Sequence, residues 1–433
     1  MIKDLIYKNI YLPKRYSRLG VDPLGFLMKS DKWSREEIDN YLLSSLKSLA
    51  DHAKSNVEYY RREFKDLSTE NYSLNDFKKI ASLTKEIIRN DPNAFRTEKE
   101  EDSVKASSSG SSGEPMTIYR STLADAYILA SHYRFHSWHG IKPNAKHVII
   151  WGTGIAPEPE RSLLKRVIKD NLVNIPLVIN VFDLNSDTID KYKKLIEDYE
   201  PVYIRGYTSS VKQLCTLLNN KKLKVNLKAA IVTSEICVQE DKDLISKALD
   251  CKTLEEYGSR DGGQFAYECP KGSLHLQEEL TYFFTDNNNE VVSTELHNTA
   301  MPMFNYKPGD KVILGDKCIC GRNSRTIYSI EGRVSDFILK EDGSKVSTWI
   351  LFYLLKDLEL SGFKDSVSQL QLIQKGNRFI VNLIKGKDFK DPELFISKYL
   401  KEKLGVNTEY EFYYLNEIPK EKSGKVKTFK RLD

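Results

Sequence analysis

The sequence predicts an α/β protein with a large N-terminal domain and a small C-terminal α+β domain. Two observations carry this prediction. Between residues 147 and 259, short apolar runs that suit buried strands alternate with segments of helical spacing, as in a sheet with helices on its faces. From residue 272 the pattern changes to short alternating strands, which predicts an antiparallel layer. We expect residues 1–333 to form the large domain and residues 334–433 the small, mobile one.

The composition bounds the class of protein. The chain has 433 residues, of which 40% are hydrophobic, enough for two or three domains with real cores. Its 66 basic and 61 acidic residues are spread along the whole length, so no stripe of one sign indicates a nucleic-acid partner. No segment has the apolar run of a signal peptide or the length of a membrane span. We therefore expect a cytoplasmic protein without an integral membrane segment.

The elements of the large domain are expected in a simple order. Helical spacing of apolar residues runs over 34–64, where Ser34 and Glu37 can form a capping box, and a second helix is expected over 76–91. A strand at 117–121 precedes a helix over 123–140. Strands and helices are then expected to alternate at 147–154, 177–184, 188–199, 203–207, 209–220, 229–235, 242–250 and 251–259.

Shorter elements complete the chain. Antiparallel strands are expected within 274–286, 290–296 and 311–316. The small domain is expected to contain strands and helices at 336–347, 348–358, 368–374, 378–384, 393–404 and 409–415.

A Ser/Gly-rich stretch, SSSGSSGEP at 107–115, separates the helical prelude from the strand at 117–121. Its glycines, hydroxyls and backbone N–H groups suit a loop that wraps a polyphosphate closely. The same composition is also that of a flexible linker, and the stretch lacks the GK[ST] ending of a P-loop. Taken alone, the stretch leaves both interpretations open.

Four metal-ligating side chains lie in two pairs within about 265–322: Cys269, His275, Cys318 and Cys320. Three thiols and one imidazole suit a closed, tetrahedral zinc site that would pin the antiparallel layer. Ordinary unligated thiols and a redox pair are the alternatives, and a disulfide is disfavoured in a cytosolic protein. The remaining cysteines, at 215, 237 and 251, have the surroundings of buried thiols.

Three further motifs are modest when taken singly. LEEYGSRDGG at 254–263 offers an aromatic ring and a carboxylate, but it also reads as an ordinary strand end. MPMFNYKPGD at 301–310, followed by GRVSDF at 332–337, offers an Asp and an Arg that could hold a ribose, although PGD is common in hairpins. The basic tail at 418–429 could place a lysine in a cleft or remain solvated. Of the histidines at 132, 136 and 139, the first two share a helical face, and the spacing supplies no third metal ligand beside them. Packing or surface roles are therefore favoured over metal binding.

The order of these motifs is more specific than any one of them. SSSGSSGEP, TSE at 233–235, YGSRD, MPMFNYKPGD, CICGR, EGRVSDF and PKEKSGKVK follow one another as in adenylate-forming ligases. The chain resembles the phenylacetate–CoA ligase branch of this superfamily, and within it the CapK-type proteins of capsular polysaccharide biosynthesis. The resemblance covers essentially the whole chain. It implies two half-reactions: ATP and a carboxylate give an acyl-adenylate and pyrophosphate, and an acceptor then takes the acyl group.

The resemblance also implies roles for individual residues. Asp261 would lie on the Mg²⁺ side, Asp310 and Arg333 would hold the ribose, Lys425 would be the catalytic lysine, and Ser335 would lie at the hinge. The remaining nucleotide-binding positions are Ser107, Ser108, Ser109, Gly110, Ser111, Ser112 and Gly113 of the phosphate loop, with Ser234, Glu235, Tyr257, Gly258, Ser259 and Arg260. The substrate pocket is sought at Tyr133, Trp138, Trp151, Arg205, Gly206 and Tyr207. The zinc ligands also occur in some relatives of this branch.

Three departures from the family pattern bear on catalysis. Glu114 replaces a lysine that is common at the end of the phosphate loop, Asp261 is a methylene shorter than the usual glutamate, and Asn305 stands where an arginine is usual. The first departure removes a cation, so the charge on the phosphates must be met from elsewhere. Lys425 and Mg²⁺ are the first candidates.

The sequence thus predicts an ATP-dependent carboxylate ligase with ATP, Mg²⁺ and structural Zn²⁺ as cofactors. The acyl acceptor could be coenzyme A, an amino compound or a sugar nucleotide, and a homodimer is compatible with the sequence. Two alternatives stay open. One is an adenylating enzyme that loads a carrier-protein thiol, and the other is a non-catalytic nucleotide-binding scaffold in surface-polysaccharide assembly.

Overall fold

The computed structural model describes residues 19–97, 103–107, 116–152, 175–219, 221–333, 337–363, 366–405, 407–421 and 423–432. The chain divides into two compact units, Met1–Ile330 and Glu331–Asp433, and each is described by itself. Among the described residues, no helix has both the length and the apolar character that crossing a membrane requires.

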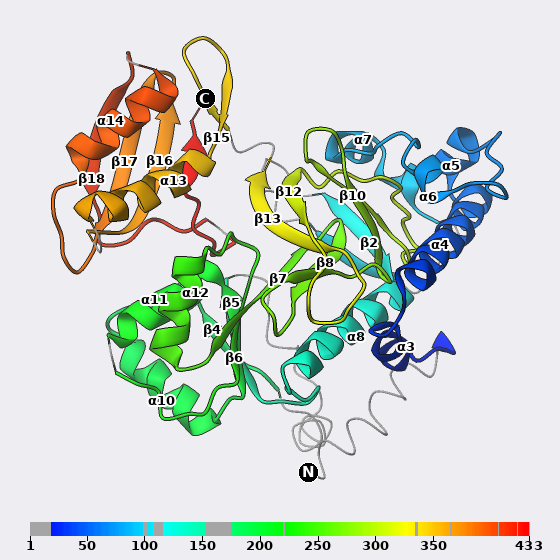
Figure 1. Ribbon diagram of the computed structural model, residues 1–433, viewed down its shortest axis with the longest axis horizontal. Helices are drawn as coiled ribbons and strands as arrows, with labels where there is room; N and C mark the ends of the chain where they lie inside the picture. The colour runs from blue at the N-terminus through cyan, green and yellow to red at the C-terminus, as the bar shows by residue number, and fades with distance from the viewer. Residues whose placement is uncertain are drawn as a thin grey trace. The chain divides into compact units, whose positions relative to one another are not determined.

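The first unit begins with a group of helices drawn in blue in Figure 1: α3 (Pro23–Ser30), α4 (Arg35–Asn56), α5 (Glu58–Glu63), α6 (Leu74–Phe77) and α7 (Lys85–Asn90), followed by a 3-10 turn at Pro92–Phe95. The capping box at the start of α4 is confirmed, since Ser34 Oγ accepts from the N–H of Glu37 over 3.2 Å. The helical run expected to continue to residue 64 is interrupted at Val57, where the backbone becomes extended.

The second helix expected in this region is split into α6 and α7. The side-chain amide of Asn305 donates to the carbonyls of Phe77 and Ile80, both over 2.8 Å. Leu83 then pairs with Tyr306 as an isolated parallel bridge. These contacts hold the segment between α6 and α7 against the 301–310 loop, so tertiary packing overrides the local helical spacing.

A nine-stranded mixed sheet forms the centre of the first unit, in the order β12-β13-β9-β8-β7-β6-β5-β3-β4. Its parallel half consists of β3 (His147–Trp151), β4 (Leu177–Asn180), β5 (Tyr203–Tyr207), β6 (Ala229–Thr233) and β7 (Lys252–Ser259). The strands β8 (Gly263–Glu268), β9 (Leu274–Leu276), β12 (Asp310–Gly315) and β13 (Thr326–Arg333) complete the other half.

The antiparallel strands expected after residue 272 are present but do not form one separate layer. β8 pairs antiparallel with β7 and extends the main sheet, because the chain reverses at the tight turn before Gly263, which has φ +104°. β10 (Thr281–Thr285) and β11 (Val291–Glu295) form a separate two-stranded hairpin. The α/β class of the large domain is confirmed.

Helices cover both faces of the parallel strands. On one face lie α10 (Ile189–Tyr199), α11 (Thr208–Leu218) and α12 (Gln239–Leu249) (Figure 1). Their apolar side chains are buried in one cluster with those of the parallel strands. On the other face, α8 (Thr122–Trp138) places Phe135 against Tyr203, Ile231 and Leu254. Burial of these side chains on both faces supplies the main stabilisation, at about 1.5–3 kcal/mol for each fully buried large apolar residue.

The second unit is a small α+β fold, as expected. The hairpin β14 (Phe337–Leu339)–β15 (Lys345–Ser347) precedes α13 (Trp349–Leu358) and a short π-helical segment at Glu359–Phe363. A four-stranded sheet has the order β18-β17-β16-β19, built from β16 (Val367–Lys375), β17 (Arg378–Lys385), β18 (Glu409–Tyr414) and β19 (Phe429–Arg431). The helix α14 (Glu393–Leu404) packs on it through Ile396 and Leu400, which are fully buried.

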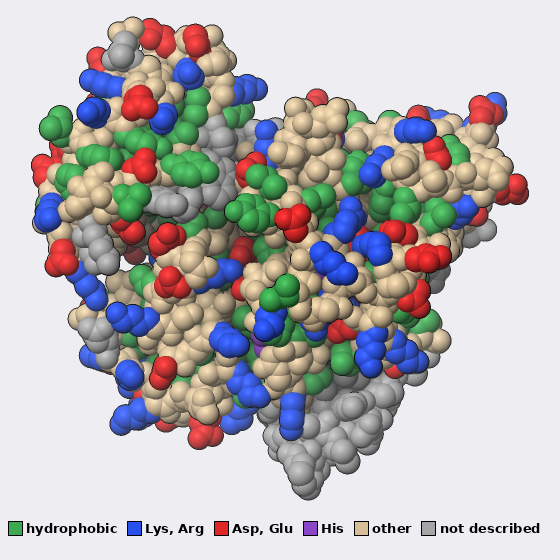
Figure 2. Space-filling view, in the orientation of Figure 1, with side chains coloured by type: hydrophobic (Ala, Val, Ile, Leu, Met, Phe, Trp, Pro, Cys, Tyr) green, Lys and Arg blue, Asp and Glu red, His purple; other side chains and the backbone are tan. Residues whose placement is uncertain are grey.

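On the face shown in Figure 2, basic and acidic side chains are interspersed rather than gathered into patches of one sign. This distribution agrees with the even spread of charge along the sequence.

Candidate functional site

The strands β1 (Ser103–Ser107) and β2 (Thr117–Ser121) form an antiparallel hairpin around the predicted phosphate loop. Ser107 pairs with Thr117, so the two ends of the loop lie side by side. The other predicted loop residues, Ser108, Ser109, Gly110, Ser111, Ser112 and Gly113, lie outside the described residues together with Glu114.

The motifs expected on the nucleoside side meet in the structure. The hydroxyl of Tyr257, on β7, donates to Oδ2 of Asp310, at the start of β12, over 3.0 Å. Both residues are buried. Gly258 follows at a register shift between β7 and β8, where an added Cβ would lie 3.0–3.1 Å from Gln264 and the Gly263 carbonyl. The turn therefore needs a glycine to keep its close packing.

Asp261 is buried under three donors. Lys85 Nζ lies 3.0 Å from its Oδ2, the hydroxyl of Tyr306 donates to the same oxygen over 2.9 Å, and the hydroxyl of Ser259 donates to Oδ1. Burial alone would raise the pKa of Asp261, but Lys85 and the two hydroxyls outweigh it and lower the pKa below its ordinary value. Asp261 is therefore an ionised carboxylate that already has a cation of its own.

This arrangement bears on the predicted magnesium site. A carboxylate offers about four acceptor positions, and three of those on Asp261 are taken. A divalent ion on the same oxygens would also stand beside the ammonium of Lys85. As described, Asp261 does not fit a direct Mg²⁺ ligand.

The other predicted nucleotide residues of the first unit make different contacts. The Glu235 carboxylate accepts from the backbone N–H of Ser209 over 2.7 Å and from its hydroxyl over 3.0 Å, and so caps the start of α11. Ser234 has a left-handed backbone with φ +67°. Arg260 is exposed, and its carbonyl accepts from the Arg120 guanidinium over 2.9 Å.

The predicted catalytic lysine belongs to the second unit. Lys425 is half-buried in a turn between β18 and β19, where its carbonyl accepts from the N–H of Glu421 over 2.8 Å. Gly424 has φ +86°, a conformation that glycine adopts without steric cost. Arg333 ends β13, and Ser335 lies outside the described residues.

The predicted pocket residues separate into two groups. Trp151 and Tyr207 pack ring to ring with centroids 4.1 Å apart at the carboxyl ends of β3 and β5, and the Arg205 guanidinium lies 5.4 Å from the Trp151 ring. Between them, Gly206 has no room for a side chain, because an added Cβ would lie 2.9 Å from the Ile150 carbonyl. Tyr133 packs instead with Ala126 and neighbouring leucines, and Trp138 lies beside the metal-ligating cluster.

A buried carboxylate that the sequence did not single out holds the first group together. Glu256, one residue before Tyr257, forms an ion pair with Arg205 and lies 3.6 Å from Nδ1 of His132. Burial would raise the pKa of Glu256, but Arg205 and His132 hold it well below its ordinary value. The sequence offered little indication of this role, because Glu256 lies within the LEEYGS strand and its distant partners cannot be read from the neighbouring residues.

His136 lies close to this group, but its ring makes no polar contact with the described residues. Burial lowers the pKa of His136 well below its usual range, so the ring is neutral. Among the described residues, neither of its ring nitrogens has a hydrogen-bond partner. Its ring centroid lies 4.8 Å from that of Tyr203, which fits the packing role expected for this histidine.

The four metal-ligating side chains come together as a compact cluster. Cys269 follows β8, His275 lies on β9, and Cys318 and Cys320 lie between β12 and β13. Their potential ligand atoms all lie within 4.8 Å of one another. The Sγ atoms of Cys269 and Cys318 are 3.7 Å apart, close to the value of about 3.8 Å that tetrahedral geometry gives for Zn–S bonds of about 2.3 Å.

The tautomer and charge of His275 also suit a metal ligand. Its Nδ1 lies 3.0 Å from the hydroxyl of Ser324, which leaves Nε2 facing the Cys320 Sγ at 3.2 Å. Burial, together with the nearby charge of Arg322, lowers the pKa of His275 to about 4. The imidazole is therefore neutral at pH 7, the form that binds metals. The donor set fits a closed zinc site.

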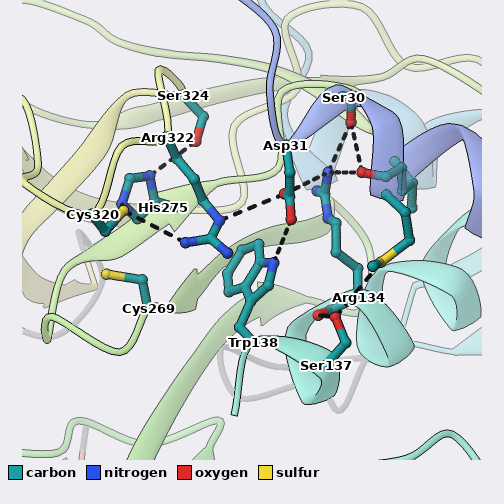
Figure 3. A network of polar contacts seen from close by, with 12 residues as sticks. Ser30, Asp31, Arg134, Ser137, Trp138, Cys269, His275, Cys320, Arg322 and Ser324 are labelled. Carbon is teal, nitrogen blue, oxygen red and sulfur yellow. Dashed lines mark hydrogen bonds and ion pairs between the residues drawn. The ribbon is translucent and has the colours of Figure 1, made fainter. Parts of the chain in front are cut away.

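Arg322 joins this cluster to α3 and α8, as Figure 3 shows. Its Nη1 donates to the Sγ of Cys320 over 3.6 Å, and its guanidinium lies 4.0 Å from the centre of the Trp138 ring. The indole N–H of Trp138 donates to Asp31 over 2.8 Å, and Arg322 Nε lies 3.6 Å from the same carboxylate. Trp138 is thus a packing partner of the candidate metal centre rather than of Trp151.

Comparisons with known proteins agree with this architecture. Residues 338–431 match the family described as the CapK C-terminal domain. The chain is 25% identical over 389 residues to protein CapK of Staphylococcus aureus, covering 86% of this chain and 85% of that protein.

Solved structures with the same fold include 2-hydroxyisobutyryl-CoA ligase in its postadenylation state with an adenylate. That structure has a TM-score of 0.72 and 16% identity, and the match covers 93% of this chain and 91% of the other. An anthranilate-CoA ligase in complex with anthranoyl-AMP matches with a TM-score of 0.50 and 14% identity, over 74% of this chain and 64% of its own. The chain therefore has the same fold as these CoA ligases, and its sequence is similar to that of protein CapK.

Proposed function

We propose that the protein is an ATP-dependent carboxylate ligase that forms an acyl-adenylate and transfers the acyl group to an acceptor. The observation that supports this most is the contact of Tyr257 with Asp310, because it joins two motifs 53 residues apart that were each assigned to the nucleoside of ATP. The solved structures with the same fold are CoA ligases captured with acyl-adenylates, which supports the same reaction class.

In the proposed reaction, a carboxylate oxygen attacks the α-phosphorus of ATP. The bond from that phosphorus to the bridging oxygen breaks, and its electron pair leaves on pyrophosphate. Positioning and cationic stabilisation should dominate such a step, since the charge spreads over phosphate oxygens. In this scheme Asp310 and Arg333 bind the ribose, Tyr257 and Gly258 flank the adenine, and Lys425 bridges the carboxylate and the α-phosphate.

The acceptor and the pathway are finer parts of the proposal. The CoA ligases named above support a thiol acceptor, and the similarity to CapK supports a role in surface polysaccharide biosynthesis with an amine or hydroxyl acceptor. Loading of a carrier protein and a non-catalytic scaffold remain the alternatives. A mass-spectrometric product assay with coenzyme A, amines, sugar nucleotides and a carrier protein distinguishes the acceptors.

We also propose that Cys269, His275, Cys318 and Cys320 hold one structural Zn²⁺. The geometry of the four donors supports this assignment, and Arg322 would offset part of the negative charge of three thiolates around a divalent ion. A zinc ion there would tie β8 and β9 to the loop before β13. It would act as a brace and take no part in the reaction.

The experiment that tests the ligase proposal is carboxylate-dependent exchange between ATP and labelled pyrophosphate. Exchange reports the first half-reaction alone, so it does not require the acceptor to be known. Exchange with at least one carboxylate supports the proposal, and a folded protein that binds ATP but exchanges with none of a broad panel supports the scaffold.

A further inference from the structure

Lys85 is a partly buried cation beside Asp261 at the predicted nucleotide site, although no sequence motif indicated it. Its side chain is 18% exposed, and its ammonium lies 3.0 Å from Oδ2 of Asp261, whose own side chain is only 4% exposed. The departure at Glu114 had removed a cation that relatives of this family use at the phosphates. Lys85 is a candidate for the missing cation.

Contacts with the loop at 301–310 position Lys85 beside Asp261. Asn305 ties down the carbonyls of Phe77 and Ile80, and the backbone of Leu83 bonds to both neighbours of Tyr306, accepting from Lys307 over 2.9 Å and donating to Asn305 over 3.2 Å. Lys85 follows two residues later, and Tyr306 meets it on the same oxygen of Asp261. The departure at Asn305 therefore serves the positioning of Lys85.

The pair also lies on the side of the site where the phosphate loop begins and ends. Arg120, on the β2 strand that follows the loop, donates to the carbonyl of Arg260, which directly precedes Asp261. Met116 lies in the same buried core as Leu83 and Tyr306. The predicted nucleoside end of the site is formed by another contact, the hydrogen bond from Tyr257 to Asp310.

Two other cations near this cluster, Lys307 and Arg120, form ion pairs with other carboxylates. Lys307 forms ion pairs with both Asp286 and Glu290, at 2.7 and 2.9 Å. Arg120 forms an ion pair with Glu295 at 3.2 Å. Among the described residues, Lys85 forms an ion pair with one carboxylate, that of Asp261. An ammonium has three donors, so Lys85 retains capacity for phosphate oxygens.

We propose that Lys85 binds the β- and γ-phosphate oxygens of ATP, with Asp261 and Tyr306 as its positioning residues. This inference rests on the proposed ligase function and goes beyond it, because Asp261 then orients a lysine rather than binding Mg²⁺ directly. When the bond at the α-phosphorus breaks, the ammonium lies where negative charge grows on the leaving pyrophosphate. Asp261 holds Lys85 in place and makes no contact with the reacting atoms.

Binding measurements test this assignment without requiring turnover. We expect Lys85→Met to weaken ATP and pyrophosphate binding by about 10- to 100-fold, the loss of a charge-assisted hydrogen bond, while AMP binding changes by less than about 2-fold. A merely structural role would alter ATP and AMP binding alike. The matched control is Lys79→Met, because Lys79 is exposed and forms an ion pair with the nearby Asp76 at 2.8 Å rather than with Asp261.

A second variant guards against loss of the fold. Lys85→Met leaves Asp261 buried without its cation, whereas the double variant Lys85→Met/Asp261→Asn removes both charges. The double variant should fold and show the same selective loss of ATP and pyrophosphate binding. If it binds ATP, pyrophosphate and AMP as the wild type does, the inference about Lys85 is wrong while the ligase proposal stands. If the wild type binds neither ATP nor AMP, the proposed function itself fails.

Discussion

The hydroxyl of Tyr257 donates to the carboxylate of Asp310 over 3.0 Å, which links the end of β7 to the start of β12. Tyr257→Phe removes this donor and leaves a buried carboxylate with one partner fewer. We expect the variant to raise the KM for ATP about 10-fold and to lose about 1–3 kcal/mol of unfolding free energy. Steady-state kinetics and urea unfolding measure the two effects. An unchanged KM together with the stability loss would assign this contact to the fold alone.

The candidate zinc centre predicts one metal ion per chain. Zinc analysis of the purified protein should give a stoichiometry near one, and Cys318→Ser should reduce zinc content and thermal stability together. Structural zinc contributes on the order of 10 kcal/mol of folding free energy in small peptides, so the loss should be large. Cys215→Ser, at a buried thiol remote from the cluster in the sequence, is the control and should keep its zinc. Zinc-free, fully stable protein would contradict the assignment.

Arg322 should tune the affinity of that centre without providing a ligand. Arg322→Ala removes the donor to Cys320 Sγ and the guanidinium over Trp138. We expect zinc affinity, measured by competition with a chelator, to fall by about 10- to 100-fold, as for other outer-shell partners of metal ligands. Arg322→Lys should restore only part of it, because an ammonium lacks the planar fork. Wild-type affinity in Arg322→Ala would show that the contact is incidental.

The Arg205–Glu256 pair predicts a stability that depends on pH. The folded-state pKa of Glu256 lies below its ordinary value of 4.5, so the pair stabilises the fold fully above about pH 5.5. That contribution is lost as the pH falls through the ordinary value toward the lowered one. Arg205→Met should therefore cost about 3–5 kcal/mol at pH 7 and progressively less in acid.

The control for this pair is Arg378→Met, because Arg378 and Glu409 form an ion pair whose side chains are both 70% exposed. Its cost should be at most about 1 kcal/mol. Both variants can be followed by urea unfolding between pH 4 and 7. A cost for Arg205→Met that does not vary with pH would contradict the assigned charge state of Glu256.

The catalytic role predicted for Lys425 separates the two half-reactions. Lys425→Ala should lower the rate of adenylation by about 10²–10³-fold, because one well-placed cation is lost from the transition state. Acyl transfer from a supplied acyl-adenylate should survive. Pyrophosphate exchange at the wild-type rate in this variant would show that the lysine has another role.

The sequence predicted the parallel half of the sheet and the helices on its faces, because the periodicity of strands and helices is a local signal. The resemblance assigned Tyr257 and Asp310 to the same nucleotide, but it did not predict the contact between them. The sequence did not reveal the split between α6 and α7, which depends on side-chain bonds from Asn305, more than 200 residues away. Lys85 and Glu256 were missed for the same reason. Each owes its role to a partner distant in sequence, and the letters around it read as an ordinary helix start or strand.

The grouping of pocket residues could not be predicted either. Tyr133 and Trp138 lie on the same helix as His132, and helical spacing does not tell which face meets the end of β5 and which meets the metal cluster. In the structure Trp138 contacts Arg322 and Asp31. Trp151 packs with Arg205 and Tyr207 in a separate group.

The central claim is that this chain activates a carboxylate with ATP. The most direct test is ATP–pyrophosphate exchange by the purified full-length protein across a panel of small hydroxy, aromatic, amino and dicarboxylic acids. The account predicts exchange that requires one of these carboxylates and falls by about 10²–10³-fold in Lys425→Ala. A folded wild-type protein that binds ATP and shows no carboxylate-dependent exchange with any member of the panel would contradict it.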